Sequence, residues 1–231
     1  MSLLRTELYG SPLVNTWLNK ELGITGRLHY INNKEKICHS LINLDKNPLM
    51  ICQLAIHLDS KLRENGLKPD PQNDLLAIQA IGKDLPEGIL DSTLKKTVQA
   101  KEILSHDLFL YPLEKSSFFT QNKKLLSSAR LDNLASVSAC CEAFLPVESD
   151  ETLSMIIFWN HEEVGSRTPQ GACSPFLEEV LERISLNFSK DRNDYFILKN
   201  NTNLFSVDMA HAIHPGFEDK HDPQHPILLE Q

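Results

Sequence analysis

The sequence predicts an α/β protein, because the two halves of the chain differ in pattern. Across residues 26–113, short apolar runs alternate with turn clusters such as Asn32-Asn33-Lys34, a pattern typical of strands. From Ser127 onward, predicted helices and strands alternate, and the strands are continuous apolar runs like those of buried parallel sheets. With 231 residues and 41% hydrophobic content, the chain can bury a sizeable core.

The elements follow in chain order. In the first half, strands are expected at residues 27–31, 37–44, 49–58, 75–81 and 108–110, with one or two helices around residues 91–104. In the second half, helices are expected at residues 133–144 and 174–186, and strands at residues 154–160 and 203–208. The helix at 174–186 has the strongest support, because its apolar residues recur at helical spacing behind Ser174-Pro175.

Charge and hydropathy exclude two kinds of partner. The net charge of −8 and the pI of about 5.6 leave no basic stripe, so we expect no nucleic-acid partner. The apolar stretches are shorter than the roughly 20 residues that cross a bilayer, so we expect no membrane partner. Arg5, Thr6 and Glu7 interrupt the start before any signal-peptide-like run, which predicts a cytoplasmic protein.

The cysteines do not form a recognisable framework. The chain has five of them and no Cys-x-x-Cys pair, which fits neither paired disulfides nor a zinc ribbon. We therefore expect them to be reduced residues of the core: Cys38, Cys52, Cys140, Cys141 and Cys173.

Carboxylates stand at the ends of predicted elements in the second half. Glu162 and Glu163 follow the strand at 154–160, Asp208 closes the strand at 203–208, and Asp132 heads a helix. Ligand sites in open α/β sheets gather at the carboxyl ends of strands, so these groups can converge on one crevice.

Each carboxylate also has a structural interpretation. Asp132 can serve as a helix N-cap, and an adjacent Glu-Glu pair is usually solvated surface. Asp208 differs, because Phe205, Val207 and Met209 around it predict burial, and a buried carboxylate needs a partner or a metal.

Four histidines follow Asp208 closely, at positions 211, 214, 221 and 225. Such a cluster indicates a polar site with metal or oxyanion chemistry. Carboxylates that bridge and flank two metal ions, with a further carboxylate to take a proton from water, suit metal-assisted hydrolysis.

Three spaced motifs resemble the M18 aspartyl aminopeptidases, and weaker similarity covers nearly the whole chain. The motifs are Arg130-Leu131-Asp132-Asn133-Leu134, His161-Glu162-Glu163-Val164-Gly165-Ser166, and Ser206-Val207-Asp208-Met209-Ala210-His211 with His214-Pro215 behind it. By this resemblance, Asp132 corresponds to the carboxylate that bridges two metal ions, and Glu163 and Asp208 to terminal metal ligands. Glu162 corresponds to the general base that activates water.

The resemblance also implies partners and a reaction. His214 matches a histidine that helps to hold the substrate and its oxyanion, and His57 matches one that reaches into a neighbouring subunit's active site. A homo-oligomer is therefore expected. The implied reaction is release of N-terminal Asp or Glu from a peptide, with two zinc ions (Zn2+) per active site.

The implied fold is a partial zinc-peptidase-like three-layer catalytic domain plus a strand-rich dimerisation domain. Residues 1–26 would be a remnant of the catalytic domain with an entry strand, residues 27–115 the dimerisation domain, and residues 116–231 the partial catalytic domain.

This sequence departs from the family pattern in its length and its metal ligands. Family members are about twice as long, and their two metal-binding histidines lie outside the part represented here. We therefore expect weak metal binding, little peptidase activity from this chain alone, and unpaired edges in its catalytic sheet. The alternative hypothesis is a non-catalytic oligomerisation or regulatory module derived from such an enzyme.

Overall fold

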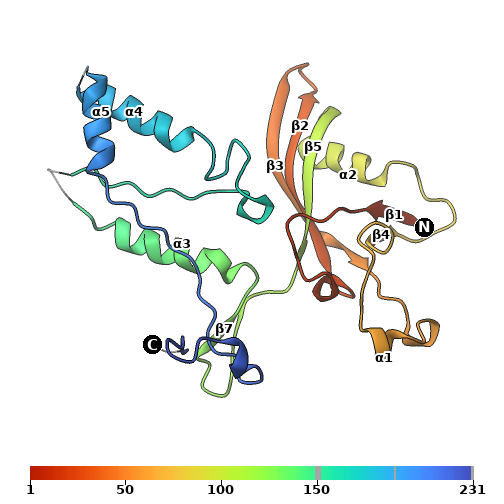
Figure 1. Cartoon of the computed structure of the whole chain (residues 1–231). Coiled ribbons are helices and arrows are strands. Elements are labelled where there is room, and N and C mark those ends of the chain that lie inside the picture. Colours follow the sequence, from red (N-terminus) through yellow and green to blue (C-terminus); the bar gives the residue numbers. More distant parts are fainter. Residues whose placement is uncertain (149–151, 190, 230–231) are drawn as a thin grey trace. The chain divides into compact units, whose positions relative to one another are not determined.

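The computed structural model describes residues 1–148, 152–189 and 191–229, and it divides the chain into two compact units between Leu126 and Ser127. Figure 1 shows the first unit dominated by strands and the second by helices and connecting chain. The domain boundaries inferred from the resemblance, at residues 26 and 115, stay predictions.

A five-stranded sheet forms the first unit, with strand order β1-β4-β3-β2-β5 and antiparallel pairing throughout. The strands are β1 (Ser2–Arg5), β2 (Leu22–Asn32), β3 (Ile37–Ile51), β4 (Leu76–Ala80) and β5 (Ala100–Pro112). The predicted runs of the first half do form strands, but the runs at 37–44 and 49–58 join in the single strand β3, which ends at Ile51. The helix predicted around 91–104 ends earlier, at Val98, and residues 100–104 belong to β5.

Alternation along β2 sets the core. Leu22, Ile24 and Leu28 are buried. The two neighbours of Leu28, Arg27 and His29, are exposed. Successive side chains of a strand point to opposite faces, so one face of β2 packs inward. Two clusters of buried side chains lie on that face, one centred on Leu22 and the other on Leu28. Helix α2 (Ile89–Val98) contributes Leu94, which is 1% exposed, to the second cluster.

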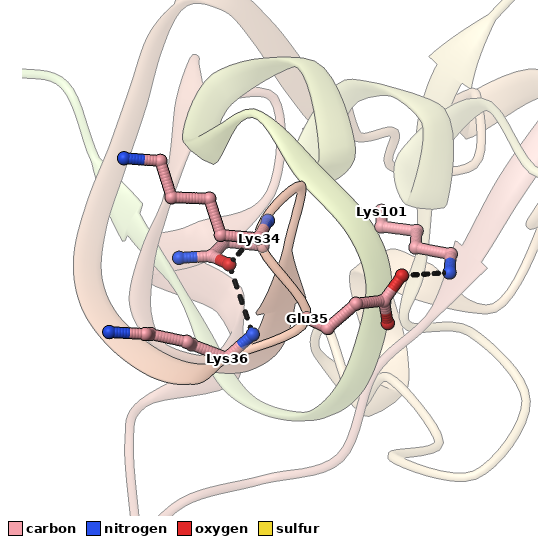
Figure 2. Close-up of polar contacts among 5 residues, drawn as sticks. Lys34, Glu35, Lys36 and Lys101 are labelled. Atoms are coloured by element: carbon pink, nitrogen blue, oxygen red, sulfur yellow. Dashed lines mark hydrogen bonds and ion pairs between the residues drawn. The ribbon is translucent and has the colours of Figure 1, made fainter.

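The hairpin between β2 and β3 is closed by the side chain of Asn32. Its Oδ1 accepts hydrogen bonds from the backbone N–H groups of Lys34 and Lys36, at 2.9 and 3.1 Å (Figure 2). An asparagine that bonds the backbone two residues on is a common way to stabilise a turn. Lys101 at the start of β5 adds an ion pair with Glu35, at 2.5 Å. This exposed ion pair contributes little. The turn is held by the Asn32 side-chain bonds together with two backbone bonds, from Asn32 N–H to the Lys36 oxygen and from Glu35 N–H to the Asn32 oxygen, both at 3.0 Å.

Shorter elements complete the described structure. The first unit also contains the 3-10 helices η1 (Val14–Trp17) and η2 (Ile56–Leu58), helix α1 (Leu62–Asn65) and strand β6 (Ser117–Phe119), which pairs with β7 (Leu125–Ser127). The second unit contains α3 (Leu131–Phe144), η3 (Glu162–Val164), α4 (Phe176–Phe188), α5 (Arg192–Asn200) and η4 (Glu218–Lys220). Both helices predicted in this half are confirmed.

The strands predicted at residues 154–160 and 203–208 do not form. Both segments run without strand structure, as Figure 1 shows. A strand needs a neighbour to bond its backbone N–H and C=O groups. Within the described part of the second unit, no strand pairs with either segment. The apolar pattern therefore lacks the partner that would convert it into sheet.

The described cysteines are free thiols, as expected, but the prediction that they are core residues is wrong. Cys52 and Cys173 are exposed, and the other three are half-buried. No helix among the described residues is long and apolar enough to cross a membrane.

At Gly26 the backbones of β2 and β5 lie too close together to leave room for a side chain. A Cβ built there would lie 2.0 Å from the carbonyl oxygen of Asp107 on β5, at a φ of +154°. Gly26→Ala therefore pushes β2 away from β5 and should lower the free energy of unfolding by about 2 kcal/mol in urea denaturation followed by circular dichroism. Gly82→Ala is the control, because its Cβ would meet only a flexible leucine methyl at 3.2 Å. Equal stability of the two variants would contradict the predicted crowding.

Candidate functional site

Helix α3 begins with an irregular turn that presents Asp132. The N-cap position is Arg130, in a left-handed conformation and without a side-chain capping bond, so the N-cap interpretation of Asp132 is wrong. Asp132 has non-helical φ and ψ of −81° and 110°, and its peptide bond to Asn133 is cis. The Asp132 side chain is exposed and does not cap the helix.

Asn133 links this turn to the segment that carries Asp208. Its Nδ2 donates a hydrogen bond to the backbone oxygen of Val207, at 3.0 Å and across 74 positions of the sequence. Asp132 directly precedes Asn133, and Asp208 directly follows Val207. The bond therefore holds these two aspartates on neighbouring stretches of backbone. The Oδ1 atom of Asn133 is buried and has no hydrogen-bond partner among the described residues.

Glu162 and Glu163 lie in η3, inside a loop tied to itself by backbone bonds. The carbonyl oxygen of His161 accepts from the N–H groups of Val164 and Ser166, at 3.3 and 2.9 Å. His161 Nδ1 also bonds Thr168 Oγ1, at 2.6 Å. Both glutamates are exposed, so the loop presents two adjacent carboxylates to solvent.

Asp208 is exposed, so the predicted burial is wrong. Phe205 is 86% exposed, and Val207 and Met209 are 50% and 41% exposed. Apolar neighbours predict burial only where a sheet forms and is covered, and the described residues around Asp208 form no sheet. The Oδ1 atom of Asp208 accepts a hydrogen bond from the N–H of Met209, at 2.8 Å.

The histidines after Asp208 shape a compact loop. His214 Nδ1 accepts from the N–H of Gly216 at 3.0 Å, which assigns the ring proton of neutral His214 to Nε2. His221 Nε2 accepts from the N–H of His214, also at 3.0 Å. The N–H of Gln224 and the ring of His225 lower the pKa of Asp222. Three of the four histidines, at positions 214, 221 and 225, thus make contacts within the loop. Exposed His214 keeps its Nε2–H available as a donor.

His57 lies in the first unit, within η2, and is exposed. His161, which the sequence reasoning did not single out, organises the Glu162 loop. Asn133 stands next to Asp132 in the first motif, and this was the only sequence feature that drew attention to it. Its bond to Val207 can be seen only once the fold is known.

The three carboxylates only partly fit a zinc centre. Carboxylates do bind zinc, but a zinc ion commonly takes four ligands, and a pair of ions needs more than three carboxylates supply. No three potential metal-binding side chains come together among the described residues. The structure places Asp132 and Asp208 on bonded segments and Glu163 on a separate loop, so the donor set is incomplete.

Carboxylates that can hold metal ions, with a further carboxylate to take a proton from water, suit metal-assisted hydrolysis. The chain belongs to the M18 family: a family model described as aminopeptidase I zinc metalloprotease (M18) matches residues 1–231. The resemblance seen in the motifs is confirmed.

Curated relatives and solved structures agree with this family. The chain is 36% identical over 228 residues to a probable M18 family aminopeptidase 2 of Clostridium acetobutylicum, covering 95% of this chain and 52% of the relative. A Streptomyces avermitilis protein of the same name is 34% identical over 228 residues, with 96% and 52% covered. The chain therefore spans about half the length of these relatives.

The solved structures confirm the fold class. An M18 aminopeptidase of Thermotoga maritima aligns with a TM-score of 0.79 at 22% identity, covering 96% of this chain and 51% of that one. The S. cerevisiae mApe1 dodecamer aligns with a TM-score of 0.73 at 26% identity, with 95% and 51% covered.

The Asn133 bond generates a direct prediction. In Asn133→Ala, the segment at 203–209 loses its tie to α3, and a hydrogen bond of roughly 0.5–1.5 kcal/mol is lost. Limited proteolysis within residues 203–209 should be about threefold to tenfold faster. Asn187→Ala, on the exposed surface of α4, is the control and should leave that cleavage rate unchanged. Identical cleavage rates in both variants would show that the bond does not hold the segment.

Proposed function

We propose that this chain carries part of the catalytic machinery of a metal-dependent aminopeptidase that releases N-terminal Asp or Glu from peptides. Family membership supports the reaction class. The Asn133–Val207 bond is the observation that carries the site assignment, because it brings the Asp132 and Asp208 segments together.

In this proposal Asp132, Glu163 and Asp208 are the residues that would hold zinc. Zinc would supply Lewis-acid chemistry to the scissile carbonyl. Glu162, exposed beside Glu163, takes the proton of the attacking water. Because the described carboxylates form an incomplete donor set, we infer that the chain alone binds zinc weakly and has little activity.

Two histidines complete the proposal. His214 has its ring proton assigned to Nε2 by the Gly216 bond, which suits donation to a developing oxyanion. His57 acts in the active site of a neighbouring subunit. Its exposed position in η2 supports that role, since the side chain is not committed to the core.

A homo-oligomer is the proposed assembly, because a relative of the same fold was solved as a dodecamer. The second candidate is an oligomerisation or regulatory module without catalysis. Two observations favour this alternative. The first unit forms a complete five-stranded sheet, and no group of three potential metal ligands comes together among the described residues.

The activity can be assayed with added zinc on chromogenic substrates that begin with Asp, Glu or Leu. We expect slow release that favours the acidic residues and is abolished by Glu162→Gln. Glu142→Gln, on the exposed face of α3, is the matched control and should retain the activity. Turnover that survives Glu162→Gln would contradict the assigned base, and a preference for Leu would contradict the assigned substrate class.

A chimera tests the residue roles where a complete donor set is present. Residues 1–231 would replace the matching segment of the C. acetobutylicum relative. We expect activity in the chimera and a loss of at least about 100-fold in kcat for Glu162→Gln, since general-base catalysis commonly contributes 10²–10⁴-fold. A folded, zinc-loaded but inactive chimera would favour the non-catalytic alternative.

A further inference from the structure

Two histidines face each other on the open side of the sheet in the first unit. His29 of β2 and His39 of β3 are direct cross-strand partners, with ring centroids 6.2 Å apart. Both are exposed, on the face opposite buried Leu28 and Ile42. Neither ring has a hydrogen bond or ion pair within the described chain, so both rings are available to a ligand.

Their spacing suits two imidazoles that share one metal ion. Zinc lies about 2.0–2.1 Å from an imidazole nitrogen, which places two rings on one ion with centroids about 5–6 Å apart. The 6.2 Å separation lies just beyond this range. Exposed side chains exchange rotamers on the picosecond-to-nanosecond timescale, so the two rings can reach the shorter separation.

The strands fix the two histidines more firmly than a loop would. The hairpin turn that sets the β2–β3 register is held by the Asn32 side chain. On its other side, β2 pairs with β5 along its length, which places Ser105 opposite His29. A rigid backbone lowers the entropic cost of bringing two ligands together.

Few charges surround the pair. On the same face, Arg27 of β2 stands opposite Asp107 of β5, and Glu102 of β5 stands opposite Ile31. The neighbours of His39 along β3, Ile37 and Leu41, are apolar. Arg27 and Asp107 balance each other, so a cation meets no strong local repulsion, and the chain as a whole carries −8.

We propose that His29 and His39 form a binding site for a divalent transition metal such as Zn2+, Ni2+ or Cu2+. Two imidazoles provide the protein ligands and water completes the coordination, because no third metal-binding side chain joins them among the described residues. Imidazole suits these ions, whereas Mg2+ and Ca2+ prefer oxygen. The site belongs to the first unit and is independent of the proposed peptidase residues.

Zinc titration of the full chain, followed by NMR of the histidine ring nitrogens, tests this site residue by residue. We expect the signals of His29 and His39 to shift together with one apparent affinity. In His39→Gln, the zinc response of His29 should weaken at least about tenfold, as loss of a ligand requires. His106→Gln, an exposed histidine of β5, is the control and should leave the pair unchanged. Magnesium should produce no shift.

Several outcomes would overturn the proposal. An unchanged response of His29 in His39→Gln would mean that each histidine binds zinc alone. Absence of any shift at His29 and His39, while other histidines respond, would mean that the pair is only a packing contact. If circular dichroism shows that His39→Gln is misfolded, His29→Gln followed at His39 decides the question by the same criteria.

Discussion

The first unit depends on the backbone bonding of β2, which lies between two long antiparallel partners. Every residue from Ile24 to Ile31 has a partner on β3 and another on β5. This double pairing satisfies the N–H and C=O groups that burial would otherwise penalise. It also fixes which face of β2 carries Leu28 and which carries His29, since a slip of one residue would exchange them. Core packing, the close approach at Gly26 and the cross-strand histidines all follow from that register.

The second unit shows the consequence when such pairing is missing. The segments at 154–160 and 203–208 have the apolar composition of buried strands, yet no strand bonds to them within the described residues. Phe205 is left 86% exposed as a result. The Asn133–Val207 bond is then a main local tie that holds the Asp208 segment near α3. A site built on such segments is less firmly positioned than one at the ends of a complete parallel sheet.

Local patterns in the sequence predicted most elements of the fold. The helix with Phe176, Val180 and Ile184 on one face and the alternating strands of the first half could be recognised, because the information lies within each segment. The strands at 154–160 and 203–208 could not be judged this way, because strand formation depends on a partner strand that a segment's own residues do not specify. The burial expected for Asp208 failed for the same reason.

The sequence motifs select candidate site residues, whose roles stay predictions, but they do not give the arrangement of these residues. The motifs identified Asp132, Glu162, Glu163 and Asp208, and the N-cap interpretation failed because the turn before α3 places Arg130 at that position. The tie through Asn133 connects residues 74 positions apart, and no local pattern reveals such a contact.

In the proposed function, this chain holds part of a zinc site and needs further ligands to complete it. Zinc content per chain, measured by mass spectrometry in a His29→Gln background with and without Asp132→Ala, tests this most directly. We predict well below two zinc ions per chain, with the bound fraction reduced by Asp132→Ala. Two tightly bound zinc ions that are lost on Asp132→Ala would show a complete site and contradict the claim. Zinc that is indifferent to Asp132→Ala would contradict the placement of the site.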